Sequence, residues 1–173
     1  MRTNSSFWNS AAINGLLFSL ITIITSLLQS AFNIQGILAI LLWCVKFGGC
    51  VYLLYYYMKQ YSNNAEYVTY GESFKYGFAL CVFSSIVCAC YIFISMTWLF
   101  PETVDIAMEQ IQTAIATGAY TSEQEDAIFN VADKLPQLTL ITCLIYYILI
   151  GAVMSSIIAN FTKKTDPFAE NNN

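Results

Sequence analysis

Lys46 is the side chain with the strongest claim to chemistry, because it interrupts a long apolar stretch. From Ile37 to Met58 the sequence contains no other charged residue. A lysine at the centre of a membrane span costs about 2.5–3.5 kcal/mol on insertion scales, and such residues are often functional. The sequence therefore marks Lys46 as a candidate for binding an anion or contacting a partner.

The sequence alone leaves several environments open for Lys46. Its side chain, which reaches roughly 6 Å, can snorkel towards the membrane surface. It can also sit neutral in the bundle, hydrogen-bonded to Asn14, a serine or a tyrosine. A wet cavity, an anionic group of a partner or lipid, and an aromatic ring are further surroundings that suit it. The nearby Gly48 and Gly49 would let another backbone approach or let the helix bend.

The cysteines form the second chemically distinctive group, and they are Cys44, Cys50, Cys81, Cys88, Cys90 and Cys143. All lie in apolar runs, without a Cys-x-x-Cys pair, in a chain that has no histidine. Zinc, haem and triad sites would thus lack their commonest ligand or base. We interpret the thiols as small packing groups and expect neither a metal nor a cofactor.

Motifs for other common chemistries are missing. The sequence has no glycine-rich phosphate loop, no Gly-x-Ser-x-Gly and no paired acidic motif at a membrane edge. The net charge of −4 also differs from the positive charge that is typical of a nucleic-acid-binding protein. We therefore expect no catalytic residue, no enzymatic activity and no nucleic-acid partner.

Composition indicates the elements that must position Lys46. Of the 173 residues, 57% are apolar and 10% charged, whereas soluble domains carry about a quarter charged residues. Four apolar stretches are long enough to cross a bilayer as helices. They cover residues 11–32, 36–58, 74–100 and 136–161. The predicted fold is an all-α integral membrane protein, with residues 1–173 forming a single four-transmembrane-helix bundle.

Basic residues predict the orientation of these spans. Those placed on one side are Arg2, Lys59, Lys75, Lys163 and Lys164. Only Lys134 falls on the other side, so we expect both termini in the cytoplasm.

The segment 101–135 is the only long connection. Pro101 suits a helix start, and residues 121–125 offer overlapping capping boxes. Two short amphipathic helices are expected in this outer segment. They would serve as a connector between spans, or as an acidic docking surface or lid.

Small residues at helical spacing predict the faces where the spans pack. Stripes lie on the first, third and fourth spans, and two adjacent glycines mark the second. The stripe on the third span contains Gly77, Cys81, Ser84, Ser85 and Cys88. The predicted packing residues are Gly15, Ser19, Thr22, Ser26, Gly48, Gly49, Gly77, Gly151, Ser155 and Ala159. Such faces pack within the chain, against a second copy of it or against a membrane protein partner. The lipid bilayer is the other expected partner of the chain.

Several short sequence patterns follow one another along the chain, and each occurs once. They are Phe7-Trp8-Asn9-Ser10-Ala11, Tyr70-Gly71-Glu72-Ser73-Phe74-Lys75-Tyr76-Gly77, Pro101, Tyr120-Thr121-Ser122-Glu123-Gln124, Ile150-Gly151, Ser156-Ile157-Ile158-Ala159 and Lys163-Lys164. In this order the chain resembles the bacterial membrane family called domain of unknown function 4199 (DUF4199). Lys46 is not part of that pattern. The resemblance implies a possible partner, a polyprenyl-phosphate-type glycosyltransferase, because family members are often encoded beside one.

Two hypotheses follow for the function. The first is a non-enzymatic accessory or scaffold protein of the inner membrane, whose partner is a membrane glycosyltransferase if the resemblance holds. The alternative is a small transporter or channel subunit for an anionic or lipid-phosphate substrate, with Lys46 as the binding charge. The alternative requires a polar cavity around Lys46.

Overall fold

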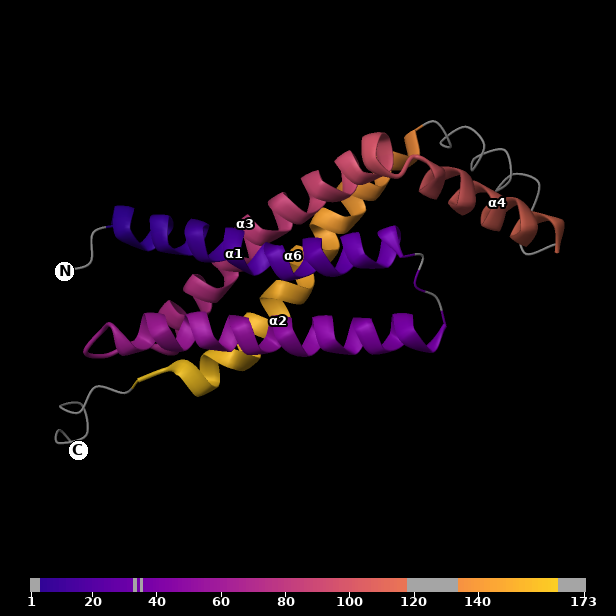
Figure 1. The fold of residues 1–173 in the computed structure, drawn as a ribbon. Coiled ribbons are helices and arrows are strands. Elements are labelled where there is room, and N and C mark those ends of the chain that lie inside the picture. Colours follow the sequence, from indigo (N-terminus) through magenta and orange to yellow (C-terminus); the bar gives the residue numbers. More distant parts are fainter. Residues whose placement is uncertain (1–3, 33, 35, 118–133, 165–173) are drawn as a thin grey trace. The chain divides into compact units, whose positions relative to one another are not determined.

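The computed structural model of the chain describes residues 4–32, 34, 36–117 and 134–164. These residues form long helices joined by short connections (Figure 1). In chain order the elements are α1 (Asn4–Ala31), α2 (Ile37–Asn63), α3 (Tyr70–Ile94), a π-helical turn η1 (Ser95–Leu99), α4 (Glu102–Ala116) and α6 (Leu135–Thr162).

Four helices in the described part of the chain are long and apolar enough to span a membrane. They are α1, α2, α3 with its continuation η1, and α6. The prediction of four spanning helices is confirmed. Most of their large apolar side chains face outwards, as lipid-facing side chains must, because hydrocarbon rather than water covers them.

The helices extend beyond the predicted apolar stretches. α1 begins at Asn4 rather than residue 11, and α2 ends at Asn63 rather than residue 58. The length of an apolar run matches the thickness of the hydrocarbon core of a bilayer, whereas a helix continues until a cap or turn ends it. The loop between α2 and α3 is correspondingly shorter than the residues 59–73 expected from polarity.

α3 begins with a capping box that the sequence analysis did not identify. The backbone N–H of Thr69 donates to Glu72 Oε2 at 2.9 Å. The backbone N–H of Glu72 donates back to Thr69 Oγ1 at 3.3 Å. This reciprocal pairing satisfies two backbone donors at the helix start and fixes the entry of α3.

The outer segment is described only in part. α4 follows Pro101, which occupies its N-cap position without a side-chain hydrogen bond, and carries Glu102 and Asp105 in its first turn. The second expected amphipathic helix, with its acidic residues and residues 121–125, lies outside the described residues. Of residues 33–35, which connect α1 to α2, the structure describes Ile34, whose N–H donates to Gln29 O. α2 then starts from Gly36 at a φ of +65°.

Contacts divide the described chain into two compact units. The first contains residues up to Cys88 and from Ile145 onwards. The second contains residues from Ala89 to Leu144, in which α4 contacts η1. Everything described below lies within the first unit.

In the first unit α1 and α2 form an antiparallel hairpin, and α3 contacts α1, α2 and α6 (Figure 1). α3 is the most enclosed span, with 44% of its most apolar window buried. α2 is the least enclosed, with only 6% buried. α2 therefore offers the largest share of its surface to lipid or to a partner.

The connection between α2 and α3 is tied to the end of α6. Val68 and Lys164 form an antiparallel bridge, with N–H to O distances of 3.0 and 2.8 Å. Lys164 Nζ also donates to Ala65 O at 3.1 Å. In the interior the hydroxyls of Ser73 and Thr162 hydrogen-bond at 2.6 Å. We call this end of the first unit the loop end.

Candidate functional site

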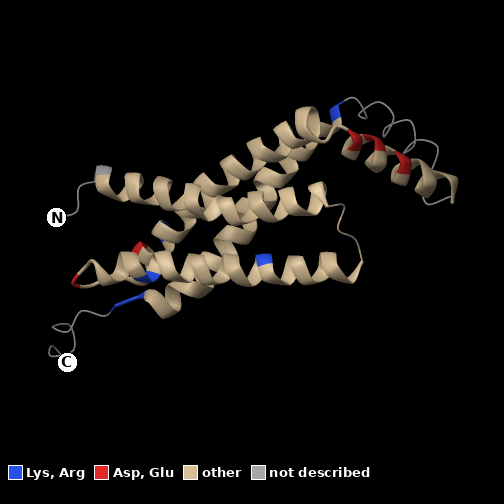
Figure 2. Cartoon of the chain, in the orientation of Figure 1, with Lys and Arg blue, Asp and Glu red and all other residues tan. Residues whose placement is uncertain are grey.

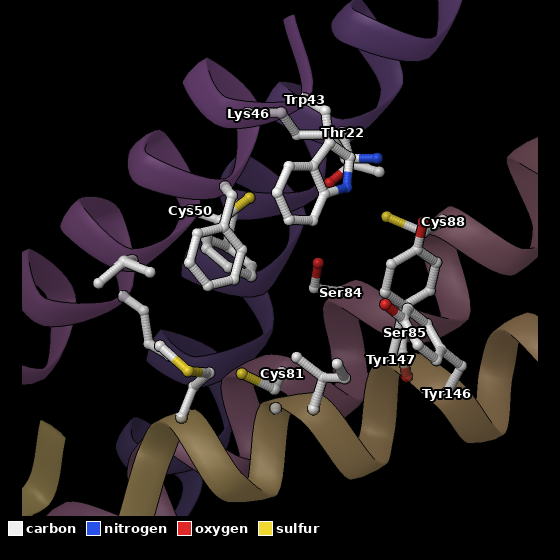
Figure 3. Close-up of a pocket in the computed structure, with 17 residues that line it drawn as sticks. Thr22, Trp43, Lys46, Cys50, Cys81, Ser84, Ser85, Cys88, Tyr146 and Tyr147 are labelled. Atoms are coloured by element: carbon white, nitrogen blue, oxygen red, sulfur yellow. The ribbon is translucent and has the colours of Figure 1, made fainter. Parts of the chain in front are cut away.

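A cavity of about 250 Å³ lies among all four helices of the first unit. α1 contributes Phe18 and Thr22, and α2 contributes the wall from Trp43 to Leu54. The side chains that line it include Lys46, Cys50, Cys81, Ser84, Ser85, Cys88, Tyr146 and Tyr147 (Figure 3). We call this space the Lys46 cavity.

Lys46 is the charged residue in the lining of this cavity. Figure 2 shows a single basic position in the middle of α2, surrounded by uncharged ribbon. The neighbouring Trp43, three residues earlier, lines the same wall. Of the environments left open by the sequence, the structure places Lys46 at a cavity formed by its own chain.

Apart from Lys46, the polar groups that line the cavity are few and uncharged, and they are hydroxyls, thiols and the Trp43 indole. The Lys46 ammonium interacts electrostatically with the thiols of Cys50 and Cys88. The Thr22 hydroxyl interacts with the same two thiols. Within the described chain, Lys46 has no hydrogen-bond or ion-pair partner. Its charge is thus left without a counterion from these residues.

The position of Lys46 along α2 limits its depth. Lys46 and Thr22 each lie nine residues from the α1–α2 connection, on α2 and α1 respectively. Nine residues of helix rise about 14 Å, and helical side chains lean towards the helix N-terminus. A lysine stem extended fully along the helix, which reaches roughly 6 Å, would bring the ammonium to about 8 Å from the level where α2 begins.

The mouth of the cavity lies between α2 and α6. Trp43 and Phe47 on α2 are exposed, and so are Tyr146 and Ile150 on α6, while all four line the cavity. The floor is buried and comes from α1 and α3, with Thr22, Ser84 and Ser85 among its residues. The opening therefore faces sideways, across the spanning helices rather than along them.

Three of the predicted packing glycines lie at direct helix contacts. A Cβ on Gly15 would lie 2.8 Å from Leu80 O, so α1 and α3 touch there. A Cβ on Gly77 would lie 2.6 Å from Met58 Sδ and 2.9 Å from Ser155 Oγ. Gly151 contacts Cys81 in the same way, with a Cβ distance of 2.5 Å.

The remaining predicted packing residues divide into two groups. Ser19, Thr22, Ser155 and Ala159 are buried, and Ser155 Oγ lies 3.8 Å from Cys81 Sγ. Ser26 and Gly49 are half-buried. Gly48 differs from the expectation, since a Cβ there would have no neighbour within 4 Å. Gly48 faces away from the bundle. The next residue, Gly49, faces the hairpin partner α1, where a Cβ would lie 3.5 Å from Ile21 Cδ1.

Asn14 does not pair with Lys46. Its side-chain amide donates to the Tyr76 hydroxyl at 2.7 Å, and Ser10 Oγ lies 3.0 Å from the same oxygen. Tyr76 is 1% exposed and stacks on Tyr61 with ring centroids 4.1 Å apart. This polar cluster lies towards the loop end, separate from the Lys46 cavity.

The aromatic mouth and the polar cluster are the features that sequence reasoning missed. Tyrosines are common at membrane interfaces, so the sequence around Tyr61 does not separate it from an interfacial aromatic belt. Tyr146 and Tyr147 carry no signal that separates them from lipid-facing residues. By contrast, the small and polar residues of α3 from Cys81 to Cys88 did mark a protein-facing stripe, and this stripe lines the cavity.

Comparison with known proteins identifies one family. The family described as "Protein of unknown function (DUF4199)" matches residues 10–164, which covers most of the chain. This confirms the suspected family. No curated protein and no solved structure matches the chain at a significant level.

Proposed function

We propose that this chain, which belongs to the DUF4199 family, is a non-enzymatic membrane protein that binds an anionic, lipid-phosphate-type ligand in the Lys46 cavity. The observation that carries the proposal is the position of Lys46. It lies on the wall of a mainly apolar cavity, and no acidic residue lines that cavity. A charge kept in such surroundings is best explained by an anion that arrives from outside the chain.

The shape of the cavity favours a ligand from the bilayer. Its volume of about 250 Å³ lies below the range of roughly 300–1,000 Å³ found for drug-sized sites. It suits a head group, whose hydrocarbon chains stay in the bilayer outside the mouth. Trp43 and Tyr146 at that mouth combine an apolar ring with a polar edge, as do side chains at membrane interfaces.

A transporter or channel subunit for an anionic substrate would require a polar cavity around Lys46, whereas the lining is mainly apolar, so we propose binding rather than transport. With the termini in the cytoplasm, as the basic residues predict, the cavity would open into the outer half of a bacterial inner membrane. Lys46 would then lie closer to the head groups of that half than to those of the other, because it is nine residues from the start of α2 and seventeen from its end.

The experiment is a lipid-binding titration with the full chain in phosphatidylcholine nanodiscs. Phosphatidic acid is the probe, and retained lipid is counted by native mass spectrometry. Lys46→Met removes the charge and keeps the stem, while Lys59→Met on the same helix is the matched control outside the cavity. Loss of a charge-assisted hydrogen bond should weaken binding by about tenfold or more in Lys46→Met alone. Equal binding by both variants and the unmodified chain would overturn the proposal.

The accessory role is a second proposal, and the exposure of α2 favours it. With only 6% of its most apolar window buried, α2 has ample free surface for a membrane partner. A membrane glycosyltransferase is the partner implied by the family resemblance. Crosslinking in the native cell, followed by mild-detergent co-purification, tests this. One recurrent stoichiometric partner supports the role, and recovery of the chain alone contradicts it.

A further inference from the structure

A second pocket lies at the loop end of the first unit, with a volume of about 280 Å³. Its polar lining combines carboxamides, hydroxyls and tyrosine rings, chiefly those of Ser10, Asn14, Gln60, Tyr61, Asn64 and Tyr76. No charged residue of the described chain lines it. We call it the amide pocket.

The amide pocket is distinct from the Lys46 cavity, because a packed layer separates them on three helices. On α1 Gly15 lies between Asn14 and Phe18, and on α2 Met58 lies between Leu54 and Gln60. On α3 the layer contains Gly77 and Leu80, between Tyr76 and Cys81. Met58 and Leu80 are fully buried, so the layer is closed.

Part of the pocket wall is held rigidly in place. The Tyr76 hydroxyl lies at hydrogen-bond distance from both Asn14 Nδ2 and Ser10 Oγ, at 2.7 and 3.0 Å. Its ring stacks on Tyr61 with an interplanar angle of 11° and meets Phe7 edge-on at 5.8 Å. Wall residues fixed in this way bind a ligand without a large ordering cost.

Other polar groups of the wall remain available. The Asn14 side-chain oxygen has no hydrogen-bond partner among the described residues, and neither do the side-chain amides of Gln60 and Asn64. Each carboxamide offers both donors and an acceptor. A ligand whose own groups both donate and accept can pair with all three amides.

From this lining we propose that the amide pocket binds an uncharged polyhydroxylated group, as carried by a free sugar or by the head group of a neutral glycolipid. Neighbouring hydroxyls on such a ligand donate and accept at once, which matches carboxamides and hydroxyls better than an anion does. An anion would meet acceptor oxygens, and no described residue of the lining carries a positive charge to offset its own.

The test is a binding titration with the full chain in phosphatidylcholine nanodiscs. The probes are glucose and myo-inositol in solution, and monoglucosyl diacylglycerol in the bilayer, with inorganic phosphate as the anionic comparison. We expect saturable binding of at least one polyhydroxylated probe and no binding of phosphate. Binding of a soluble probe identifies a free sugar as sufficient, whereas binding of the glycolipid alone identifies a membrane head group.

Paired variants locate the binding. Gln60→Ala combined with Asn64→Ala removes two amides from the exposed side of the pocket and should weaken binding about tenfold. Asn63→Ala removes an exposed amide of the same helix that does not line the pocket, and should bind normally. Lys46→Met should also bind normally. The proposal is overturned if no polyhydroxylated probe binds, if phosphate binds as well as they do, or if the double variant keeps full affinity.

Discussion

The side-chain amide of Asn14 donates a hydrogen bond of 2.7 Å to the hydroxyl of Tyr76, and this bond joins α1 to α3 inside the first unit. Ser10 Oγ lies 3.0 Å from the same hydroxyl, and Tyr76 is buried. One tyrosine oxygen thus serves two polar side chains of α1. The pair therefore supports both the fold and the wall of the amide pocket.

Tyr76→Phe should destabilise the chain by about 1–3 kcal/mol, because it leaves Asn14 and Ser10 without their partner while keeping the ring stack. Reversible unfolding in mixed micelles measures this loss. Asn14→Ala in the Tyr76→Phe background should add little further, since the interaction is already broken. Additive losses in the double variant would mean that the two residues act separately.

Gly151→Ala should destabilise the contact between α6 and α3 by about 1–3 kcal/mol, because the added methyl group overlaps Cys81. Gly48→Ala is the matched control, since a methyl group there meets nothing and alanine favours helix. Thermal unfolding in the same detergent compares the two variants. A Gly151→Ala protein as stable as Gly48→Ala would contradict the close contact.

Lys46→Met should leave stability unchanged or raise it by up to about 3 kcal/mol in the absence of anionic lipid, because it removes an uncompensated charge from the membrane interior. Unfolding in phosphatidylcholine-containing micelles measures this effect. Stability gained together with binding lost is the behaviour of a residue kept for function. A marked loss of stability would instead identify Lys46 as a structural residue.

Thr162→Val should cost about 1–2 kcal/mol, because it leaves the buried Ser73 hydroxyl without its interhelical partner. Ser73→Ala should cost less, because the Thr162 hydroxyl still donates to Ile158 O at 3.1 Å. The double variant should cost no more than the larger single loss, since no unpaired hydroxyl remains. Chemical unfolding of the four proteins forms a double-mutant cycle. Strict additivity in that cycle would argue against the 2.6 Å bond.

The predicted orientation gives a labelling test. All native cysteines lie in spanning segments, so an impermeant maleimide should label the unmodified chain poorly. In intact cells Glu109→Cys on α4 should react, and Asn63→Cys at the loop end should react only after the membrane is opened. The reverse pattern would place the termini outside.

The apolar runs were sufficient to predict the four spans, because each helix must supply about 20 residues of hydrocarbon contact. Small residues such as Gly15 and Gly151 also carried a readable signal, since only a missing side chain allows such close approach. Gly48 shows the limit of that signal, because the sequence does not distinguish a glycine that faces outwards from one that contacts a helix. Asn14 and Tyr76 lie 62 residues apart in the chain, and no local sequence pattern predicts that they pair.

The glycine contacts have a mechanical consequence for the first unit. α3 meets α1 at Gly15 and α6 at Gly151, each time through a small contact area. α6 can rotate about its close contact with α3, because Gly151 leaves no side chain there to block the motion. The bridge between Val68 and Lys164 lies further from Gly151 along α6 than Tyr146 at the mouth does. The bridge therefore acts as a latch, which resists any rotation of α6 that would widen the mouth.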